Sequence, residues 1–223
     1  GIASGVALIF VSSDGENMIG VASGANLELT PSDIDRLPDS VFQPGDVLLV
    51  GLEIPISTAI RAMKRAKAGG MTVILNPAPA PSLTESEVSI LLSSADLITP
   101  NRVEAMMLAG VGQDKPSGPA SFARALLKKG PRAVVMTLGA EGCLIVEGDV
   151  AETTIPAPRV EAVDAVGAGD AFNGALAVAL GEKRRLIDAA AWAVRAASLA
   201  VTKPGAQSAL PRRSEIDGFI QQP

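Results

Sequence analysis

The sequence contains no histidine and no tyrosine, and Cys143 is its single cysteine. Without histidine, a Ser-His-Asp triad, a Cys-His pair and every His-ligated metal site are excluded. A general base in this chain must therefore be a carboxylate or a lysine. A lone cysteine forms no internal disulfide, which favours a reducing compartment. Because Cys143 opens the apolar run CLIV, we expect it to be a buried small side chain.

Long hydrophobic runs and an excess of positive charge are also absent. No uninterrupted apolar stretch approaches the roughly 18 residues that a membrane span requires. The net charge is −5, so the chain lacks the electrostatic footprint of a nucleic-acid binder. The basic clusters at 61–67, 183–185 and 212–213 are interpreted as solvated helix faces or ends. We therefore expect neither a membrane nor a nucleic acid as a partner.

The glycine fingerprints of two common nucleotide-binding folds are missing. There is no GxxxxGK[ST] motif, which excludes a P-loop NTPase. Gly167, Gly169 and Gly174 do not match GxGxxG, and no strand is expected directly before them because prolines interrupt residues 155–158. A nicotinamide-dependent oxidoreductase is therefore disfavoured.

A regular alternation of short apolar runs and amphipathic stretches is present instead. Strand patterns cover residues 46–51, 72–76, 95–99, 133–139 and 143–148. Helix patterns cover 56–70, 84–92, 102–109, 117–129, 168–180 and 186–201, and a short helix starts at Arg213. This order predicts an α/β fold with a mostly parallel sheet and helices on both of its faces. Ahead of it, residues 5–21 predict a β-hairpin that turns at Asp14-Gly15.

Polar residues directly follow several of the predicted strands. They are Glu53, Asn76, Asn101 with Glu104, and Thr137 with Gly139. In open α/β sheets, ligands bind beyond the carboxyl ends of the strands. We therefore expect these residues to gather at one edge of the sheet.

The segment VDAVGAGDAFNG, residues 163–174, combines an anion-binding signal with a carboxylate. Gly167 and Gly169 expose backbone amides at a helix start, which attracts phosphate. Asp170 would oppose a phosphate there unless a hydroxyl lies between them. An Asp that accepts the proton of an attacking alcohol fits this position, with the amides of 167–169 stabilising a transferred phosphoryl group. The alternative is structural: the glycines make a turn, and Asp170 interacts with the helix dipole.

These motifs together resemble one family. DAVGAGDAFNGAL is similar to the signature of the ribokinase-like (PfkB) carbohydrate kinases. GVALIFVSSDGENMIG, LNPAPAP, TPNRVEA, VVMTLGAEGCLI and VTKPGAQSALPRRSEI resemble further family segments in the same order and spacing. The resemblance covers essentially the whole chain. It implies a ribokinase-like α/β fold and ATP-dependent phosphorylation of a pentose, D-ribose to D-ribose 5-phosphate.

The resemblance also implies roles for individual residues. Asp170 resembles the catalytic base, and Gly167, Ala168 and Gly169 would form the anion hole for the γ-phosphate. Asn101 and Glu104 resemble the pair that manages Mg·ATP, with Glu104 acting on Mg²⁺ through water. Thr137, Gly139 and Gly142 would approach the nucleotide, and Glu53 resembles an acidic residue near the sugar.

A potassium site is implied beside the anion hole. Its ligands would be the Asp164 side chain and the carbonyls of Val166, Ala200, Lys203 and Gly205. The serine that completes this set in the family corresponds to Ala209, with Ser208 one residue earlier, so it stays open whether the chain preserves the site. From the residues alone, Asp164 could also be a loop-capping Asx turn.

Members of the family carry about a further third of chain before the matching region. That segment supplies an early sugar-binding Asp, a GGKGAN-like loop and the rest of a β-lid. We therefore expect residues 1–25 to be a partial lid hairpin and 26–223 an N-terminally incomplete nucleotide-binding domain. In the intact protein the lid would mediate a homodimer, and the cytoplasm is the expected location.

Two alternatives to a ribose kinase are kept. One is another sugar or nucleoside kinase of the same family, because the sugar-selecting residues lie mainly in the segment that precedes the match. The other is a nucleotide-binding fragment with no activity of its own. Both would bind ATP, so turnover with a given sugar distinguishes them from a ribose kinase.

Overall fold

The computed structural model describes residues 1–223 except 12–16, 81–82, 111–117, 149–151 and 220–223. Its main sheet has six strands in the order β3-β4-β5-β6-β7-β8. The strands are β3 Val47–Val50, β4 Thr72–Leu75, β5 Leu97–Ile98, β6 Ala133–Thr137, β7 Cys143–Glu147 and β8 Thr153–Ile155. The first four are parallel, β7 pairs antiparallel with β6, and β8 pairs antiparallel with β7. The predicted mostly parallel α/β sheet is confirmed.

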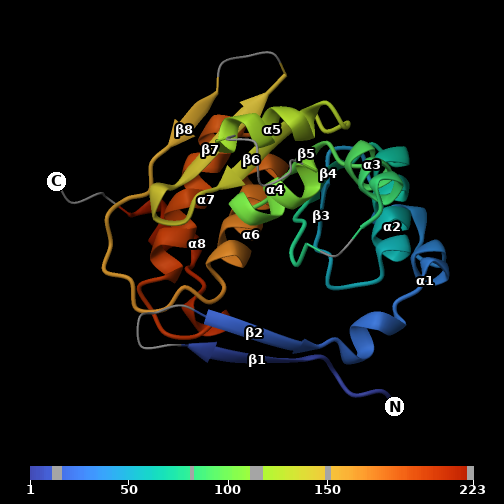
Figure 1. The fold of residues 1–223 in the computed structure, drawn as a ribbon, viewed down its shortest axis with the longest axis horizontal. Helices are drawn as coiled ribbons and strands as arrows, with labels where there is room; N and C mark the ends of the chain where they lie inside the picture. Colours follow the sequence, from blue (N-terminus) through green and yellow to red (C-terminus); the bar gives the residue numbers. More distant parts are fainter. Residues whose placement is uncertain (12–16, 81–82, 111–117, 149–151, 220–223) are drawn as a thin grey trace.

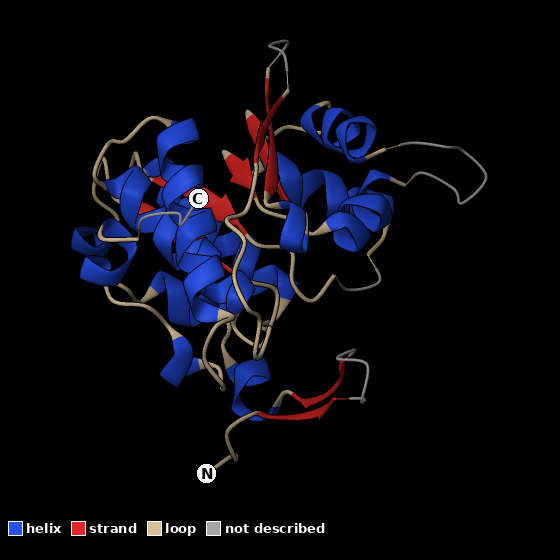
Figure 2. Ribbon diagram, turned by 90° about the vertical axis from the view of Figure 1, so that its left-hand side faces the viewer, coloured by secondary structure: helices blue, strands red, loops and turns tan. Residues whose placement is uncertain are grey.

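Helices cover both faces of this sheet (Figures 1 and 2). One core cluster holds α2 Ile56–Ala68, α3 Glu85–Ser93, α4 Arg102–Ala109 and α5 Pro119–Leu127. The other holds α6 Ala168–Gly181, α7 Leu186–Ala200 and α8 Arg213–Asp217. In β4, Val73 and Leu75 pack into the first cluster and Ile74 into the second, as the two-residue period of a strand requires.

Strand β8 is not predicted by the sequence pattern. The prolines of residues 155–158 argue against a strand, yet Thr153–Ile155 pairs with β7 and ends directly before Pro156. The prediction fails because β8 lies at the edge of the sheet, where a proline after the last residue costs no ladder bond. The predicted helix start at Ser117 and the hairpin turn Asp14-Gly15 lie outside the described residues.

Local capping explains where three helices begin. Thr30, Thr84 and Asn101 are N-caps, and each forms a capping box with an acidic residue three positions later.

Cys143 is fully buried in β7, and burial raises the pKa of its thiol to about 12. It is therefore the inert small core residue that was expected. In the described part of the chain, every helix is too short or too polar to cross a membrane.

A separate two-stranded sheet precedes this body. β1 Val6–Val11 and β2 Asn17–Ala22 pair antiparallel, which confirms the predicted hairpin. Figures 1 and 2 show it below the helices and apart from the main sheet. The short helices η1 Gly24–Glu28, α1 Pro31–Asp35 and η2 Asp39–Val41 lead from it to β3.

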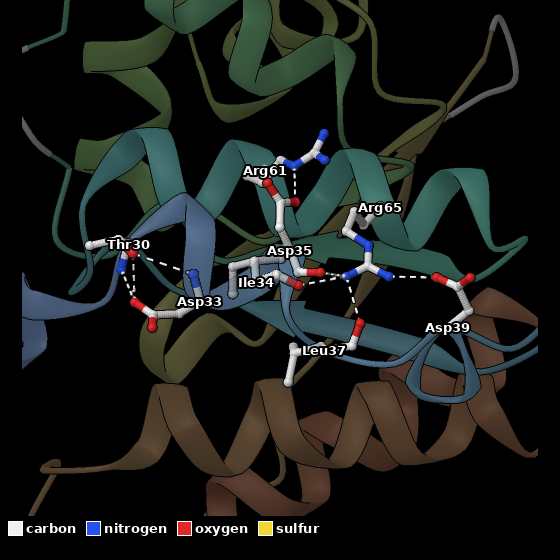
Figure 3. A network of polar contacts seen from close by, with 8 residues as sticks. All are labelled: Thr30, Asp33, Ile34, Asp35, Leu37, Asp39, Arg61 and Arg65. Atoms are coloured by element: carbon white, nitrogen blue, oxygen red, sulfur yellow. Dashed lines mark hydrogen bonds and ion pairs between the residues drawn. The ribbon is translucent and has the colours of Figure 1, made fainter.

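Arg65 of α2 fastens this connecting segment to the body (Figure 3). Its Nη1 donates to the carbonyls of Ile34, Asp35 and Leu37 at 2.6, 3.3 and 2.9 Å. Its Nη2 pairs with Asp39, and its side chain is only 15% exposed. The interpretation of residues 61–67 as a solvated face is therefore wrong for Arg65, which binds main-chain carbonyls at and just beyond the end of α1.

Candidate active site

The carboxyl ends of the parallel strands meet at one edge of the sheet. Glu53 follows β3, Asn76 follows β4, Asn101 follows β5, and Thr137 ends β6. Asn101 and Thr137 form an isolated parallel bridge, and the Thr137 amide donates to the Pro100 carbonyl at 3.0 Å. The Leu52 amide donates to the Ala78 carbonyl at 3.0 Å, which holds the loop of Glu53 beside the loop after β4. The predicted gathering at this edge is confirmed.

The first turn of α6 has free backbone donors. Its N-cap is Gly167, with a φ of 77° and no side chain capping the helix end. The amide of Ala168 donates to the Ala165 carbonyl at a long 3.3 Å. Among the described residues, the amides of Gly167 and Gly169 donate to no protein acceptor. Such amides carry the positive end of the helix dipole and suit an anion.

Asp170 is the third residue of α6 and is exposed. Within the described part of the chain its carboxylate pairs with no basic side chain and accepts no hydrogen bond from another side chain. It therefore remains available beside the free amides. Both the proton-accepting role and the purely structural role are compatible with this position.

A cavity of about 640 Å³ joins this turn to the loop after β6. Thr137, Gly139, Gly142, Ala168 and Gly169, all expected at the nucleotide, line it together. Glu53, Asn101, Glu104 and Asp170 do not line it. The structure thus brings the TLG and GAG motifs to one cavity, with the remaining predicted residues outside its walls. Its volume is in the range of small-molecule sites.

Two walls of the cavity were not predicted. One is the extended segment after β8, including Ala157, Arg159 and Val160, and the other is α7 with Ala197 and Ser198. The run of small residues in α7 is the one available signal for the second wall, but alanines in a buried helix usually mean close packing alone. The first wall has no signal, because β8 itself is not predicted.

Asn101 and Glu104 form one unit at the start of α4. Asn101 Oδ1 accepts from the Glu104 amide at 2.9 Å, and Glu104 Oε2 accepts from the Asn101 amide at 2.8 Å. Glu104 is 8% exposed. Burial raises the pKa of its carboxyl, and the hydrogen bond from Asn101 opposes this only in part. A buried carboxylate without a positive partner is a cost to the fold, which is typical of a functional position.

Replacing Glu104 with glutamine is expected to raise the free energy of unfolding at pH 7. The folded chain binds the Glu104 proton more tightly than the unfolded chain does. The contribution of Glu104 to the free energy of unfolding is therefore fully present below the pKa of the unfolded chain. It is lost as the pH rises through the pKa of the folded chain. Glutamine keeps the acceptor for the Asn101 amide and carries no charge. Urea unfolding at pH 7 and near pH 4 measures the effect, which should vanish at the lower pH.

Glu87 provides the matched control. It occupies the same capping-box position in α3, but its pKa is lowered by hydrogen bonds from the Thr84 hydroxyl and amide. Its stabilisation is present above the unfolded pKa and lost as pH falls through the folded pKa. Glu87→Gln should therefore lower stability at pH 7. Effects of the same sign for both variants would contradict the assignment of Glu104 as a destabilising buried charge.

Asp164 joins two loops near α6. Its Oδ1 accepts from the Val166 amide and its Oδ2 from the Gly205 amide, both at 2.9 Å. These two hydrogen bonds lower the pKa of the carboxyl. The Asx turn that the sequence left open is therefore present. Each oxygen retains a second lone pair, so the turn and a cation at Asp164 are compatible.

The other expected potassium ligands come from two segments, one before α6 and one at the end of α7. Val166 precedes α6, while Ala200, Lys203 and Gly205 lie at and beyond the end of α7. Ala209 is fully buried, whereas the Ser208 hydroxyl donates to the Pro204 carbonyl at 3.3 Å. A Cβ on Gly205 would lie 2.6 Å from Ser208 Oγ. The hydroxyl beside Gly205 therefore comes from Ser208.

Clusters of three or more acidic or cysteine side chains that could hold a metal are absent from the described residues. A cation held by the described residues at this edge would therefore need backbone, water or phosphate oxygens among its ligands. Such all-oxygen sets suit hard cations.

Comparisons with known proteins converge on one family. The model of the pfkB family of carbohydrate kinases matches residues 1–213. A ribokinase of Haemophilus influenzae is 38% identical over 218 residues, which are 98% of this chain and 69% of that protein. A deoxyribokinase of Salmonella typhi is 36% identical over 217 residues, 97% of this chain and 69% of that protein.

Solved structures agree with this result. Ribokinase from Thermotoga maritima superposes with a TM-score of 0.83 at 33% identity, over 97% of this chain and 69% of that one. Ribokinase from Arabidopsis thaliana, solved in complex with ribose and ATP, gives a TM-score of 0.77 at 29% identity. That match covers 95% of this chain and 67% of that one.

Proposed function

Because the chain belongs to the pfkB family of carbohydrate kinases, we propose that it transfers the γ-phosphoryl group of ATP to D-ribose, forming D-ribose 5-phosphate and ADP. The observation that carries the proposal is the first turn of α6. There the amides of Gly167 and Gly169, which have no acceptor in the described part of the chain, lie on the same turn as the exposed Asp170, which has no ionic partner there.

Asp170 is the proposed general base. The sugar hydroxyl gives its proton to the carboxylate as its oxygen bonds to the γ-phosphorus, and the bond from that phosphorus to the bridging oxygen of ADP breaks. The absence of histidine leaves a carboxylate as the natural acceptor. An exposed side chain on a helix anchored in the core can meet a substrate from solvent without rearrangement.

The amides of the same turn are the proposed anion hole. Gly167 and Gly169 offer donors that need not give up a protein hydrogen bond, and Ala168 gives up only a long one. Donors fixed before the reaction stabilise charge that develops on the transferred group without reorganising. We assign the cavity formed by Thr137, Gly139, Gly142 and α7 to the nucleotide.

Magnesium is assigned to Asn101 and Glu104. Only Oε2 of Glu104 is used in the capping box, and no fully buried side-chain oxygen in the described residues lacks a partner. Oε1 therefore reaches solvent and can hold a metal-bound water. The ion would neutralise phosphate charge when bound.

Potassium is assigned to Asp164 and the carbonyls of Val166, Ala200, Lys203 and Gly205. The fit is supported by the second lone pairs of Asp164 and by the hydroxyl of Ser208 beside Gly205. A cation there would add positive potential close to the N-terminus of α6. Asp164 also holds the loop before α6 against the loop after α7, whatever its cation content.

Deoxyribose is the second candidate substrate, since a deoxyribokinase is 36% identical, the same value as for the ribokinase of Staphylococcus aureus. We place the sugar near Glu53, which is exposed at the end of β3.

The hairpin of residues 1–25 is proposed as part of a lid, with 26–223 as the nucleotide-binding domain. Val6, Leu8 and Val21 are 56–63% exposed on it, and we propose that they contact a second copy in a homodimer.

The test is ADP release by this chain with Mg·ATP and D-ribose or 2-deoxy-D-ribose, with and without potassium. Sugar-dependent ADP release, with the phosphate recovered on the sugar, supports the proposal. ATP binding without turnover of either sugar would instead support a nucleotide-binding fragment. A rate that does not change with potassium would overturn the assignment of Asp164 and its carbonyl partners.

A further inference from the structure

A chain of buried and part-buried hydrogen bonds runs from the ends of β4 and β5 to the first turn of α6. Asn76 Nδ2 donates to the Thr99 carbonyl at 3.0 Å. The Thr99 hydroxyl donates to Asn173 Oδ1 at 2.5 Å, across 74 positions of sequence. Asn173 Nδ2 donates to the Gly169 carbonyl at 2.9 Å. We call these three side chains the Asn76–Thr99–Asn173 relay.

The direction of each bond follows from chemistry. The Gly169 carbonyl can only accept, so the atom of Asn173 that faces it is the nitrogen. The other end of that amide is then an oxygen, which obliges the Thr99 hydroxyl to donate. Thr99 is 1% exposed and Asn173 4% exposed, so water cannot replace either partner. The bond to Gly169 therefore specifies the direction of the bond between Asn173 and Thr99, while Asn76 binds the main chain of Thr99.

The end of the relay coincides with the proposed chemistry. The carbonyl of Gly169 and the amide of Asp170 belong to one planar peptide unit. A hydrogen bond that fixes the carbonyl also fixes the plane in which the Asp170 amide lies, and with it the start of the Asp170 side chain. Asn76 directly follows β4, and Thr99 directly follows β5. The hydrogen bonds therefore hold the Gly169–Asp170 peptide in place relative to the sheet.

We propose that Thr99 and Asn173 are positioning residues for phosphoryl transfer, which hold the peptide between Gly169 and Asp170 in its working orientation. This inference rests on the proposed function of Asp170. Neither residue touches the cavity or the expected reacting atoms. Their effect is therefore expected in kcat, with little change in the KM for the sugar.

The decisive variant is Thr99→Val, which keeps the shape of the side chain and removes the hydroxyl. Asn173 Oδ1 then loses its donor, and the amide is free to turn away from Gly169. We expect kcat to fall about tenfold to a hundredfold, the loss associated with misplacing a catalytic group by a fraction of an ångström to an ångström. Thr99→Ser retains the hydroxyl and should restore most of kcat.

Ser94→Ala separates positioning from general stability. Ser94 is 6% exposed, and its hydroxyl donates to the Ile90 carbonyl at 2.7 Å. It lies between the end of α3 and the start of β5, at the end of the strand away from the candidate site. Both Ser94→Ala and Thr99→Val should lower the midpoint of thermal unfolding by a few degrees. Only Thr99→Val should lower kcat.

A second readout needs no turnover. The carbonyl ¹³C and amide ¹⁵N resonances of the Gly169–Asp170 peptide should move in Thr99→Val and stay in place in Thr99→Ser and Ser94→Ala. If the wild-type chain releases no ADP with any sugar, the proposed function fails, and these resonances still decide the inference. Unmoved resonances overturn it, as does a Thr99→Val variant that turns over like Ser94→Ala or a Thr99→Ser variant without rescue.

Discussion

Asp170→Asn lowers sugar-dependent ADP release by a factor of about 10²–10⁴, the usual contribution of a general base. Asparagine has nearly the same size and cannot take up the proton of the attacking hydroxyl. Because Asp170 is exposed and has no charged partner among the described residues, the unfolding midpoint should stay close to that of the wild type. Steady-state kinetics with ribose at saturating ATP, together with thermal unfolding, measures both quantities.

Asp188→Asn is the control for this result. Asp188 is also the third residue of its helix, α7, and is likewise exposed. Its partner is Arg185, a surface ion pair that contributes at most about 1 kcal/mol. Turnover should be unchanged in this variant. An Asp170→Asn enzyme that retains wild-type kcat would leave only the helix-dipole role for Asp170.

Gly142→Ala lowers the free energy of unfolding by about 2–6 kcal/mol, the sum of backbone strain and overpacking. Gly142 has a φ of 96° and a ψ of −125°, a conformation that residues with a side chain avoid. A Cβ there would lie 2.0 Å from the Ile155 carbonyl oxygen and 2.6 Å from the Ala157 nitrogen, both backbone atoms. The new methyl group must therefore displace the segment after β8. Chemical denaturation measures the loss.

Gly139→Ala, in the same turn, isolates the strain. Gly139 has a φ of 60°, and a Cβ there would meet no atom within 4 Å. Only the left-handed backbone is penalised, at about 1–2 kcal/mol. If Gly142→Ala were no less stable than Gly139→Ala, the backbone of Ile155 and Ala157 would have to lie farther from Gly142 than the 2.0 and 2.6 Å contacts of its Cβ require.

The fold was predictable because its signals are local. The strand runs 46–51, 72–76 and 133–139 are bounded by glycine, proline or asparagine, and Thr30, Thr84 and Asn101 mark helix starts by their own chemistry. Capping boxes and buried apolar runs depend on neighbours within four positions, so one sequence suffices. The edge strand β8 carries no comparable pattern in its three residues.

The site was predictable only in part. Its motif residues lie at strand ends and at the start of α6, positions that topology alone brings together. The cavity walls from residues 157–162 and α7, and the pairing of Thr99 with Asn173, arise from packing between segments far apart in the chain. Asp164 illustrates the same limit. Its near amide donor, Val166, is 2 positions away, but the other donor, Gly205, is 41 positions away, and only the folded chain shows that contact.

The contact of Arg65 with the segment after the hairpin also determines how that segment can vary. Nη1 binds three carbonyl oxygens of the main chain, so the side chains of residues 34–37 contribute nothing to these particular bonds. Substitutions in that segment can accumulate while the attachment persists. Position 65 has no such freedom, because lysine cannot reach three carbonyls and a carboxylate with one fork of donors. Among homologues, we expect variable residues opposite an arginine that hardly changes.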